Sequence, residues 1–325
     1  MKRTEELAIG LDIGGTKILT ALVSKDGEVV SKLQCDTKGG NELIGDQIMD
    51  AILALLEEAE IEMKRIKGIG IATAGVIDSK KKEIIYASNL NLANFPIGNL
   101  LEKKLGLPVQ LYNDANAAAV GEWMWGGGKG KSNLIYITVS TGIGAGIISN
   151  NSLLTGGHDS AGEFGHISIN LSGPPCPCGN KGCLENYASG TAISKIARER
   201  LENGAESHYF SAKNSNLTAV DIFRAAKMGD SFSIGFLEEI GEYLGLGIIN
   251  LIHLFNTEAV ILGGGVMNES ELLLPSIRRT VQKHGITSMV EQVNIEKSKL
   301  GNYACVVGAT GLFFSHSHDR SAQPI

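Results

Sequence analysis

The sequence predicts an α/β fold made of two α/β lobes with a cleft between them. Apolar runs of strand length alternate with segments of helical spacing along the chain, which is typical of an α/β layer architecture. A strand, a glycine turn and a second strand span residues 7–23, and the same pattern returns about 126 residues later at 133–149. This repeat suggests an internal duplication, one copy in each lobe.

The first half reads as a sheet with helices around it. Buried-type strands are bounded by glycine or Asp-Gly turns, and Ile44, Ile48 and Ile52 recur at helical spacing. We therefore expect strands at 7–13, 18–23, 28–34, 67–72 and 109–113, and helices at 43–59 and 115–125.

The second half repeats this pattern and then becomes helical. We expect strands at 133–139, 146–149 and 259–262, a glycine turn at 140–146, and helices at 186–203, 218–228, 232–255, 269–284 and 305–314. The glycine-rich run 126–131 suits a hinge. We assign 1–120 to a small N-terminal lobe and 121–304 to a large lobe, with a helix at 305–318 that packs back on the small one.

Composition narrows the class of protein. The 325 residues carry a formal net charge of −6, which argues against a nucleic-acid-binding surface. The longest apolar run, 244–255, is too short to cross a bilayer. We expect no signal peptide, because no long apolar stretch follows the two basic residues near the N-terminus. The acidic charge fits a protein that handles a small molecule. Cys35 and Cys305 read as reduced buried thiols, which predicts a cytoplasmic location.

A short loop carries four side chains that ligate metals. His166, Cys176, Cys178 and Cys183 suit a tetrahedral structural Zn²⁺ ion with no open position. A disulfide is the alternative, but the group has an odd number of cysteines, and a C-x-C pair has awkward geometry for a bridge. We therefore expect zinc to hold this loop in place.

Two carboxylates, Glu163 and Glu185, bracket the predicted zinc loop. They read either as solvated loop acids or as acceptors for the hydroxyls of a polyhydroxylated ligand. A zinc-bound imidazole keeps its second N–H available in a fixed orientation, so His166 could serve the metal and the ligand together. The adjacent metal favours the binding role.

Glycine turns follow three predicted strands, at 12–17, 140–146 and 263–265. Each alone could be an ordinary turn, but together their backbone N–H groups suit the phosphates of a nucleotide. They match neither the P-loop nor the dinucleotide-binding fingerprint. Asp12 either caps its turn or holds Mg²⁺ through water.

The segment Tyr112-Asn-Asp-Ala-Asn116 joins a strand to a helix. Asn113 or Asp114 could be the helix N-cap, which is the common use of these residues at such a place. A carboxylate here could also remove a proton from a substrate hydroxyl. Both interpretations stay open at this point.

These motifs together resemble the ROK family (repressor, ORF, kinase). The resemblance covers nearly the whole chain in the family's order. The matching segments are LDIGGTK at 11–17, GIATAGVID at 70–78, YNDANAAAVGE at 112–122, STGIGAGI at 140–147, AGEFGH at 161–166, CPCGNKGCLE at 176–185 and LGGGV at 262–266.

The resemblance implies an actin-like ATPase (ribonuclease H-like) fold and ATP-dependent phosphorylation of a hexose on its 6-hydroxyl. Asp114 would be the base, and the chain would form a homodimer or homotetramer. The loop Thr73-Ala74-Gly75 departs from the family pattern because it has no proline. The implied sugar contacts are Gly75, Asn89, Asn113, Asp114, Glu163, His166 and Glu185; the implied nucleotide and Mg²⁺ contacts are Asp12, Gly14, Gly15, Thr16, Lys17, Thr141, Gly142 and Gly264.

The resemblance leaves the exact activity open. The motifs look most like glucokinases, and N-acetylmannosamine and N-acetylglucosamine kinases share nearly the same residues. Fructokinases fit less well. The family also contains sugar-sensing transcriptional regulators. Only about ten residues precede LDIGGTK, so we do not expect a helix-turn-helix domain.

Overall fold

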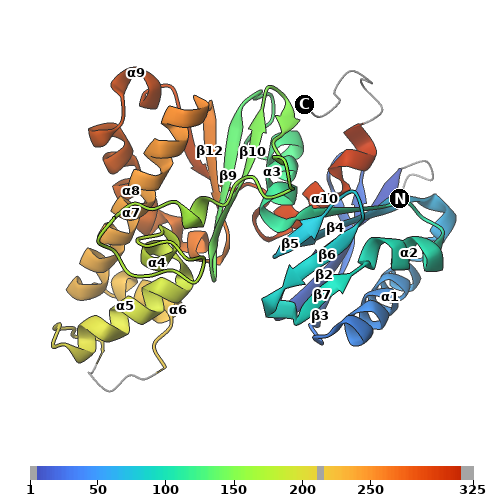
Figure 1. Ribbon diagram of the computed structural model, residues 1–325, viewed down its shortest axis with the longest axis horizontal. Helices are drawn as coiled ribbons and strands as arrows, with labels where there is room; N and C mark the ends of the chain where they lie inside the picture. The colour runs from blue at the N-terminus through green and yellow to red at the C-terminus, as the bar shows by residue number, and fades with distance from the viewer. Residues whose placement is uncertain (1–5, 211–215, 316–325) are drawn as a thin grey trace. The chain divides into compact units, whose positions relative to one another are not determined.

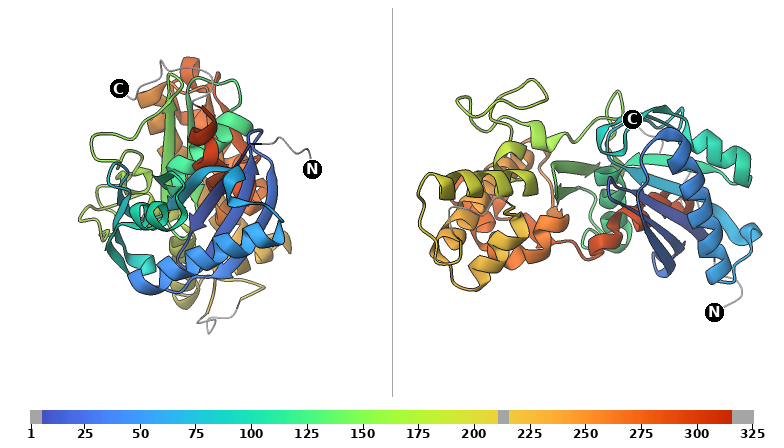
Figure 2. Two further views of the ribbon diagram at one scale, coloured as in Figure 1. Left: turned by 90° about the vertical axis from the view of Figure 1, so that its right-hand side faces the viewer. Right: turned by 90° about the horizontal axis from the view of Figure 1, so that it is seen from below.

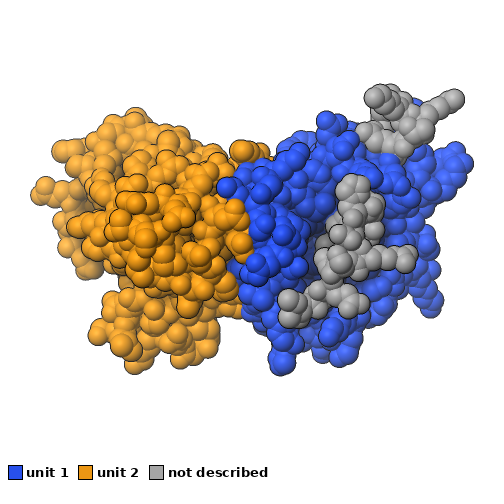
Figure 3. Space-filling model, turned by 90° about the horizontal axis from the view of Figure 1, so that it is seen from above, with its two compact units in different colours: residues 1–132, 146–161, 302–325 blue, residues 133–145, 162–301 orange. Residues whose placement is uncertain are grey.

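The computed structural model describes residues 6–210 and 216–315. The chain divides into two compact units, which are coloured separately in Figure 3. Unit 1 comprises Met1–Ser132, Gly146–Ala161 and Asn302–Ile325, and unit 2 comprises Asn133–Ala145 and Gly162–Gly301. The lobe limits and the cleft expected from the sequence stay predictions, and each unit is described by itself.

A five-stranded sheet of order β3-β2-β1-β4-β8 forms the centre of unit 1. β1, β2 and β3 are antiparallel neighbours, whereas β4 and β8 run parallel to β1. All five strands were predicted, and all five are confirmed. Their bounds are β1 Leu7–Ile13, β2 Lys17–Ser24, β3 Val29–Asp36, β4 Ile66–Thr73 and β8 Val109–Asn113.

Helices cover both faces of this sheet (Figures 1 and 2). On one face, α1 (Asn41–Glu58) and α2 (Ile97–Leu105) bury an isoleucine- and leucine-rich core with β1 and β4. On the other face lie α3 (Asp114–Trp125) and α10 (Ala304–Ser315). The alternation of side chains along β1 and β4 separates the two faces.

The last helix, α10, lies unusually close to its neighbours. A Cβ added at Gly10 of β1 would come within 2.2 Å of Val306 O, and one at Gly70 of β4 within 1.9 Å of Ala309 O. Glycine in the sheet thus lets α10 touch the strand backbones. The predicted helix over 305–314 is confirmed, and residues 316–318 of its longer version lie outside the described residues.

A small antiparallel sheet of order β5-β6-β7 completes unit 1 and was not predicted. Its strands are too short to show a periodic pattern. Turns and single-turn helices link these elements. Their bounds are η1 Met63–Arg65, β5 Val76–Asp78, β6 Glu83–Ala87, η2 Ser88–Leu90 and β7 Leu92–Phe95.

The second large sheet has the order β11-β10-β9-β12-β13 and confirms the predicted repeat. In both sheets a run of three consecutive strands is followed by two strands that lie parallel to the first of the run. β13 was not predicted. The bounds are β9 Leu134–Val139, β10 Ile143–Ser149, β11 Ser152–Leu153, β12 Ala259–Gly263 and β13 Asn294–Lys297.

The glycine turn of this repeat is shorter than predicted. A turn over 140–146 was expected, but β10 already begins at Ile143 because Ser140 N donates to Gly142 O at 2.9 Å. That hydrogen bond closes the turn within three residues. β10 then continues from unit 2 into unit 1.

The predicted helix at 186–203 is wrong in one respect: it is broken at Ser189. This residue has ψ 160° and caps a new helix by accepting a hydrogen bond from Ala192 N.

None of the helices in the described part of the chain combines the length and the apolar character that a membrane span requires. The helices and single-turn helices between residues 164 and 303 are η3 Phe164–His166, α4 Glu185–Ala188, α5 Gly190–Glu202, α6 Ala219–Lys227, α7 Ser231–Phe255, η4 Gly265–Glu269, α8 Ser270–His284, α9 Thr287–Val290 and η5 Gly301–Tyr303.

Candidate functional site

Three parallel strands of unit 1 end at the same level. Ile13 of β1 pairs with Thr73 of β4, which pairs with Asn113 of β8. Ligands of open α/β sheets bind at such carboxyl ends. This edge carries Asp12, one residue before the end of β1, and Asp114, one residue after the end of β8.

The structure separates the roles of Asn113 and Asp114. Asn113 is the N-cap of α3, because its Oδ1 accepts hydrogen bonds from Ala115 N at 3.0 Å and Asn116 N at 3.3 Å. Asp114 is the first residue of the helix, and its Oδ1 accepts from Ala115 N at 2.8 Å. One carboxylate oxygen of Asp114 is thereby oriented by the backbone.

Burial at this edge of unit 1 disfavours the ionised form of its carboxyl groups. Burial raises the pKa of Asp114, and burial together with the charge of Asp114 raises the pKa of Asp12 to about 7. Cys305 lies beneath, with its Sγ 3.6 Å from Asp114 O. Burial, and after it the charges of Asp12 and Asp114, raise the pKa of the Cys305 thiol well above its usual value. A cation or a shared proton would relieve the two carboxylates.

The first glycine turn presents unused backbone donors. Gly14 N donates to Lys17 O at 3.0 Å and closes the turn. Among the described residues, no hydrogen-bond acceptor pairs with the amides of Gly15 and Thr16. A Cβ at Gly15 would come within 2.9 Å of Asn89 O, so predicted nucleotide and sugar contacts adjoin here.

The loop after β4 also needs glycine. Gly75 has φ 107°, and a Cβ there would come within 2.5 Å of Tyr86 O. Thr73 Oγ1 donates to Ile13 O at 3.4 Å and so links this loop to the end of β1. The loop departs from the family pattern in sequence, and it is nevertheless fixed against the strand that carries Asp12.

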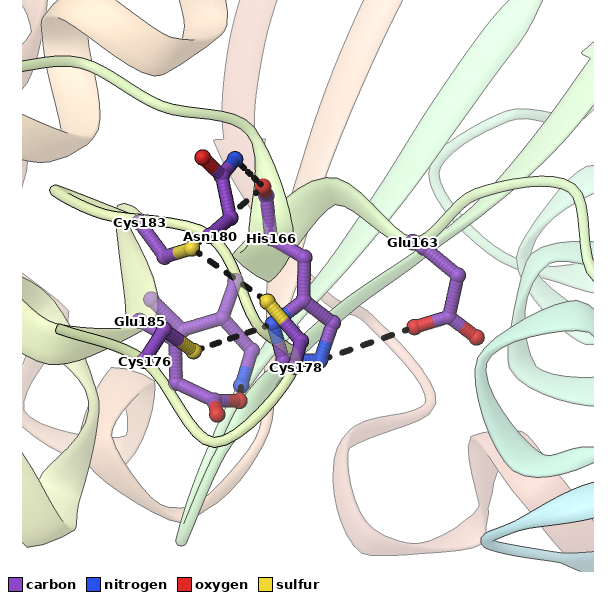
Figure 4. A network of polar contacts seen from close by, with 8 residues as sticks. Glu163, His166, Cys176, Cys178, Asn180, Cys183 and Glu185 are labelled. Atoms are coloured by element: carbon purple, nitrogen blue, oxygen red, sulfur yellow. Dashed lines mark hydrogen bonds and ion pairs between the residues drawn. The ribbon is translucent and has the colours of Figure 1, made fainter. Parts of the chain in front are cut away.

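Unit 2 brings the four predicted zinc ligands together. Their ligand atoms all lie within 4.8 Å of one another, as Figure 4 shows. His166 Nδ1 is 3.6 Å from Cys176 Sγ, and Cys178 Sγ is 3.7 Å from Cys183 Sγ. A tetrahedral site with Zn–S bonds of about 2.3 Å has sulfur–sulfur edges of roughly 3.8 Å, so the spacing fits zinc.

The thiols of the cluster lie close enough to affect one another. Burial and the neighbouring thiols raise the pKa of Cys183 to about 12. The chain turns tightly here, with Gly179 at φ 95° and Gly182 at φ 64°. Cys176 N donates to Asn180 O at 2.8 Å and closes the turn between ligands.

The two acids take different positions around this cluster (Figure 4). Glu163 Oε2 lies 3.9 Å from His166 Nε2, on the side of the ring away from the thiols. Glu185 begins α4, and its Oε2 accepts from Ile143 N at 2.8 Å. The imidazole therefore offers Nδ1 to a metal and Nε2 to a ligand beside Glu163.

Glycine also brings two other loops of unit 2 close to the second turn. A Cβ at Gly142 would come within 2.5 Å of Glu185 Oε2, and one at Gly264, with φ 89°, within 2.4 Å of Val139 O. Thr191 Oγ1 donates to Thr141 O at 2.8 Å. The predicted phosphate turn, the end of β12 and the start of α5 thus share one edge of unit 2.

A hollow of about 410 Å³ lies next to this edge and was not predicted in detail. It is lined by Val220 and Phe223 of α6 and by Gly265 and Val266 of η4. No motif marks the α6 residues, because an apolar helix face reads as core. The glycine run at 263–265 was the only signal that pointed to this place.

Comparison with known proteins gives a consistent result. The model of the ROK family matches residues 8–315. A glucokinase of Halalkalibacterium halodurans is 37% identical over 92% of each chain. A xylose repressor of Caldicellulosiruptor bescii is 36% identical over 94% of this chain and 78% of the repressor.

A solved structure extends this comparison to the fold. The ROK family glucokinase of Streptomyces griseus, determined with glucose and AMPPNP, has a TM-score of 0.81 and 35% identity over 94% of this chain and 98% of that one. The similarity confirms the predicted actin-like ATPase fold.

Proposed function

Because the chain belongs to the ROK family, we propose that it transfers the terminal phosphoryl group of ATP to the 6-hydroxyl of a hexose, glucose first. The observation that carries the proposal is the partly buried Asp114 carboxylate at the carboxyl edge of unit 1, near Asp12. The glucokinase relatives support the sugar and the donor.

Asp114 is the proposed base. It accepts the proton of the 6-hydroxyl while the oxygen forms a bond to the phosphorus and the bond to ADP breaks. Its carboxylate is oriented by a hydrogen bond from Ala115 N at 2.8 Å. A pKa raised by burial makes it a stronger base than a solvated aspartate.

A divalent cation fits the same edge. Asp12 and Asp114 lie close enough for the charge of Asp114 to raise the pKa of Asp12, and Mg²⁺ in nucleotide sites is held by one or two carboxylates, waters and phosphate oxygens. When bound, Mg²⁺ would neutralise charge on the phosphates. Asp12 would hold it, and the amides of Gly15 and Thr16 would bind phosphate oxygens.

Unit 2 would hold the sugar and the nucleoside. Glu163, Glu185 and His166 Nε2 supply acceptors and a donor for hydroxyls, and zinc on the four ligands would keep their loop rigid. The apolar hollow between Phe223 and Val266 suits a nucleoside base. Gly264 and Thr141 lie at the edge where the phosphates would pass.

The experiment is a coupled ADP-release assay over a panel of hexoses and N-acetylhexosamines. Turnover of glucose above the other sugars supports the proposal, and turnover only of N-acetylmannosamine or N-acetylglucosamine would replace the sugar but keep the reaction.

Regulator function is the second candidate, because the xylose repressor aligns along the same residues. Salt-dependent DNA binding without ADP release would favour it. The cytoplasmic location and the oligomeric state stay predictions.

A further inference from the structure

The loop over residues 155–162 leads the chain to Glu163, one of the proposed sugar contacts. Three of its eight residues are glycines, so few side chains are available to fix its backbone. Ala161 N donates to Thr155 O at 3.0 Å and closes the loop at its base. What holds the loop between these two residues bears on where Glu163 lies.

Asp159, in the middle of this loop, has an uncommon backbone conformation. Its φ is 55°, in the left-handed region that few side chains adopt without strain. A glycine would take this conformation at no steric cost. Backbone geometry alone therefore does not explain an aspartate at this position, and the contacts of its side chain have to.

The carboxylate of Asp159 joins the loop to the small sheet of unit 1. Its Oδ2 accepts hydrogen bonds from Ser79 N at 2.9 Å and from Ser79 Oγ at 2.7 Å. Ser79 directly follows β5, and both residues are half-buried. Hydrogen bonds to an ionised acceptor are stronger than those between neutral groups, so this pair fixes the loop against the end of β5.

The two paired residues each stand close in the chain to a proposed sugar contact. Asp159 comes four residues before Glu163, and Ser79 comes four residues after Gly75. The strand between Gly75 and Ser79 is itself held, because β5 pairs with β6. One carboxylate thus couples two sugar-contact segments that are far apart in the sequence.

The short segment between Asp159 and Glu163 has little conformational freedom. Gly162 has φ 92°, and a Cβ there would lie 2.0 Å from Ala145 O. Gly162 O also accepts a hydrogen bond from Ala145 N at 2.9 Å, and Glu163 O accepts one from His166 N at 3.1 Å. A displacement of Asp159 would therefore be transmitted to Glu163 rather than absorbed between them.

We propose that Asp159 is a positioning residue of the candidate sugar site, which orders the loop before Glu163 through its hydrogen bonds to Ser79. The inference rests on the proposed function, because it concerns the sugar that Glu163 would bind. Asp159 acts through Glu163 and needs no contact with the sugar. A loop that is ordered before binding loses less entropy when the ligand binds, so the effect is on sugar affinity and not on the chemical step.

The test measures glucose binding by isothermal titration calorimetry and glucose turnover by the ADP-release assay. Asp159→Gly suits the left-handed backbone and removes the carboxylate. It should raise the Kd and the KM for glucose by roughly threefold to tenfold, the size of one hydrogen bond, and should change kcat by less than about twofold. Where the panel shows another sugar to be turned over best, that sugar replaces glucose in both measurements.

Three further variants make the result specific. Asp159→Asn keeps an acceptor oxygen and should restore Kd and KM to within about twofold of the wild type. Ser79→Ala removes only one of the two hydrogen bonds, and it should add little to the effect of Asp159→Gly when the two are combined. Glu60→Gly is the matched control, because Glu60 is an exposed acid just after α1 with the same φ of 55°. It should leave both constants unchanged.

The outcomes separate this role from the proposed function. An unchanged Kd in Asp159→Gly would overturn the positioning role and leave the reaction intact. A fall in kcat as large as the rise in KM would also overturn it, because ordering of the loop does not act on the chemical step. Weaker sugar binding in Asp159→Gly without ADP release from any variant would support the positioning role and overturn the reaction. Absence of binding to every sugar would overturn both.

Discussion

The pKa of Asp12 is raised to about 7, first by burial and then by the negative charge of the Asp114 carboxylate. These residues belong to different strand ends, yet β1, β4 and β8 bring them to one edge of unit 1. Two carboxylates so placed cannot both ionise without cost. The same cost becomes an advantage when a cation or the proton of a substrate is present.

The first prediction concerns stability. The pKa of Asp12 is about 7 in the folded chain and 3.8 in its ordinary state, so ionisation of Asp12 destabilises the fold as pH rises from about 4 through 7. Asp12→Asn should therefore raise the free energy of unfolding at pH 8 in metal-free buffer, by up to a few kcal/mol. Denaturant titrations at pH 4 and pH 8 measure this difference, which should vanish at the lower pH.

Magnesium provides the matching check. Mg²⁺ should raise the melting temperature of the wild-type protein and affect Asp12→Asn much less, because binding to the folded state alone stabilises it. Asp26→Asn, which changes an exposed aspartate in a turn, is the control. An Asp12→Asn protein that is less stable than the wild type at pH 8 would show that the pair carries no electrostatic cost.

A second prediction concerns the proposed base. Asp114→Asn should lower kcat by about 10²–10⁴, the usual contribution of general-base catalysis. The KM for the sugar should change little, since the amide keeps the shape of the carboxylate. Asp46→Asn, at an exposed position of α1, should leave turnover unchanged. Near-normal turnover of Asp114→Asn would remove Asp114 from the role of base.

Removal of the cation gives a third prediction. Excess chelator should abolish ADP release, because the triphosphate charge would be uncompensated. Re-addition of Mg²⁺ should restore the activity. A short exposure to chelator separates this effect from loss of the more tightly held zinc, whose content is measured in the same sample. Turnover that persists with no free Mg²⁺ would contradict the role proposed for Asp12.

The zinc cluster supplies a fourth prediction. Cys178→Ser should release the ion, measured by mass spectrometry of the metal content, and should raise the KM for the sugar more than it lowers kcat. The reason is that Glu163 and His166 lie on the loop that the ion would fix, with Nε2 of His166 3.9 Å from Glu163. Cys35→Ser, outside the cluster, is the control. Unchanged sugar affinity in a metal-free sample would show that the loop is rigid without zinc.

The sequence was most predictive where several functional side chains lie close together along the chain. The zinc ligands form a short, specific spacing, and the predicted cluster forms in the structure. The repeated strand–glycine–strand pattern predicted two related sheets, which the strand orders confirm. The sequence left the N-cap open between Asn113 and Asp114, and the structure makes Asn113 the cap; the role of Asp114 as base stays a prediction.

The sequence was less informative where tertiary context decides. Ser189 interrupts an apolar pattern that continues across it, so the break before α5 was not visible. The wall of the hollow between α6 and η4, which includes Phe223, has the spacing of core residues. Only the folded chain distinguishes an apolar residue that lines a cavity from one that packs in the core.

The last prediction tests the close packing of α10. A Cβ at Gly308 would lie 1.7 Å from Ala117 O of α3, and backbone cannot move aside cheaply. Gly308→Ala should therefore lower the free energy of unfolding by about 1–3 kcal/mol or more, the usual cost of overpacking. Because Cys305 of the same helix lies 3.6 Å from Asp114 O, kcat should fall as well.

A second glycine provides the opposite control for this prediction. Gly235 is exposed in α7, and a Cβ there would meet nothing within 4 Å. Gly235→Ala should raise the free energy of unfolding by roughly 0.5–1 kcal/mol, because alanine favours the helix over glycine, and should leave kcat unchanged. Urea titrations of both variants measure the contrast. Equal stability of Gly308→Ala and the wild type would mean that α10 does not lie against α3 as the structure has it.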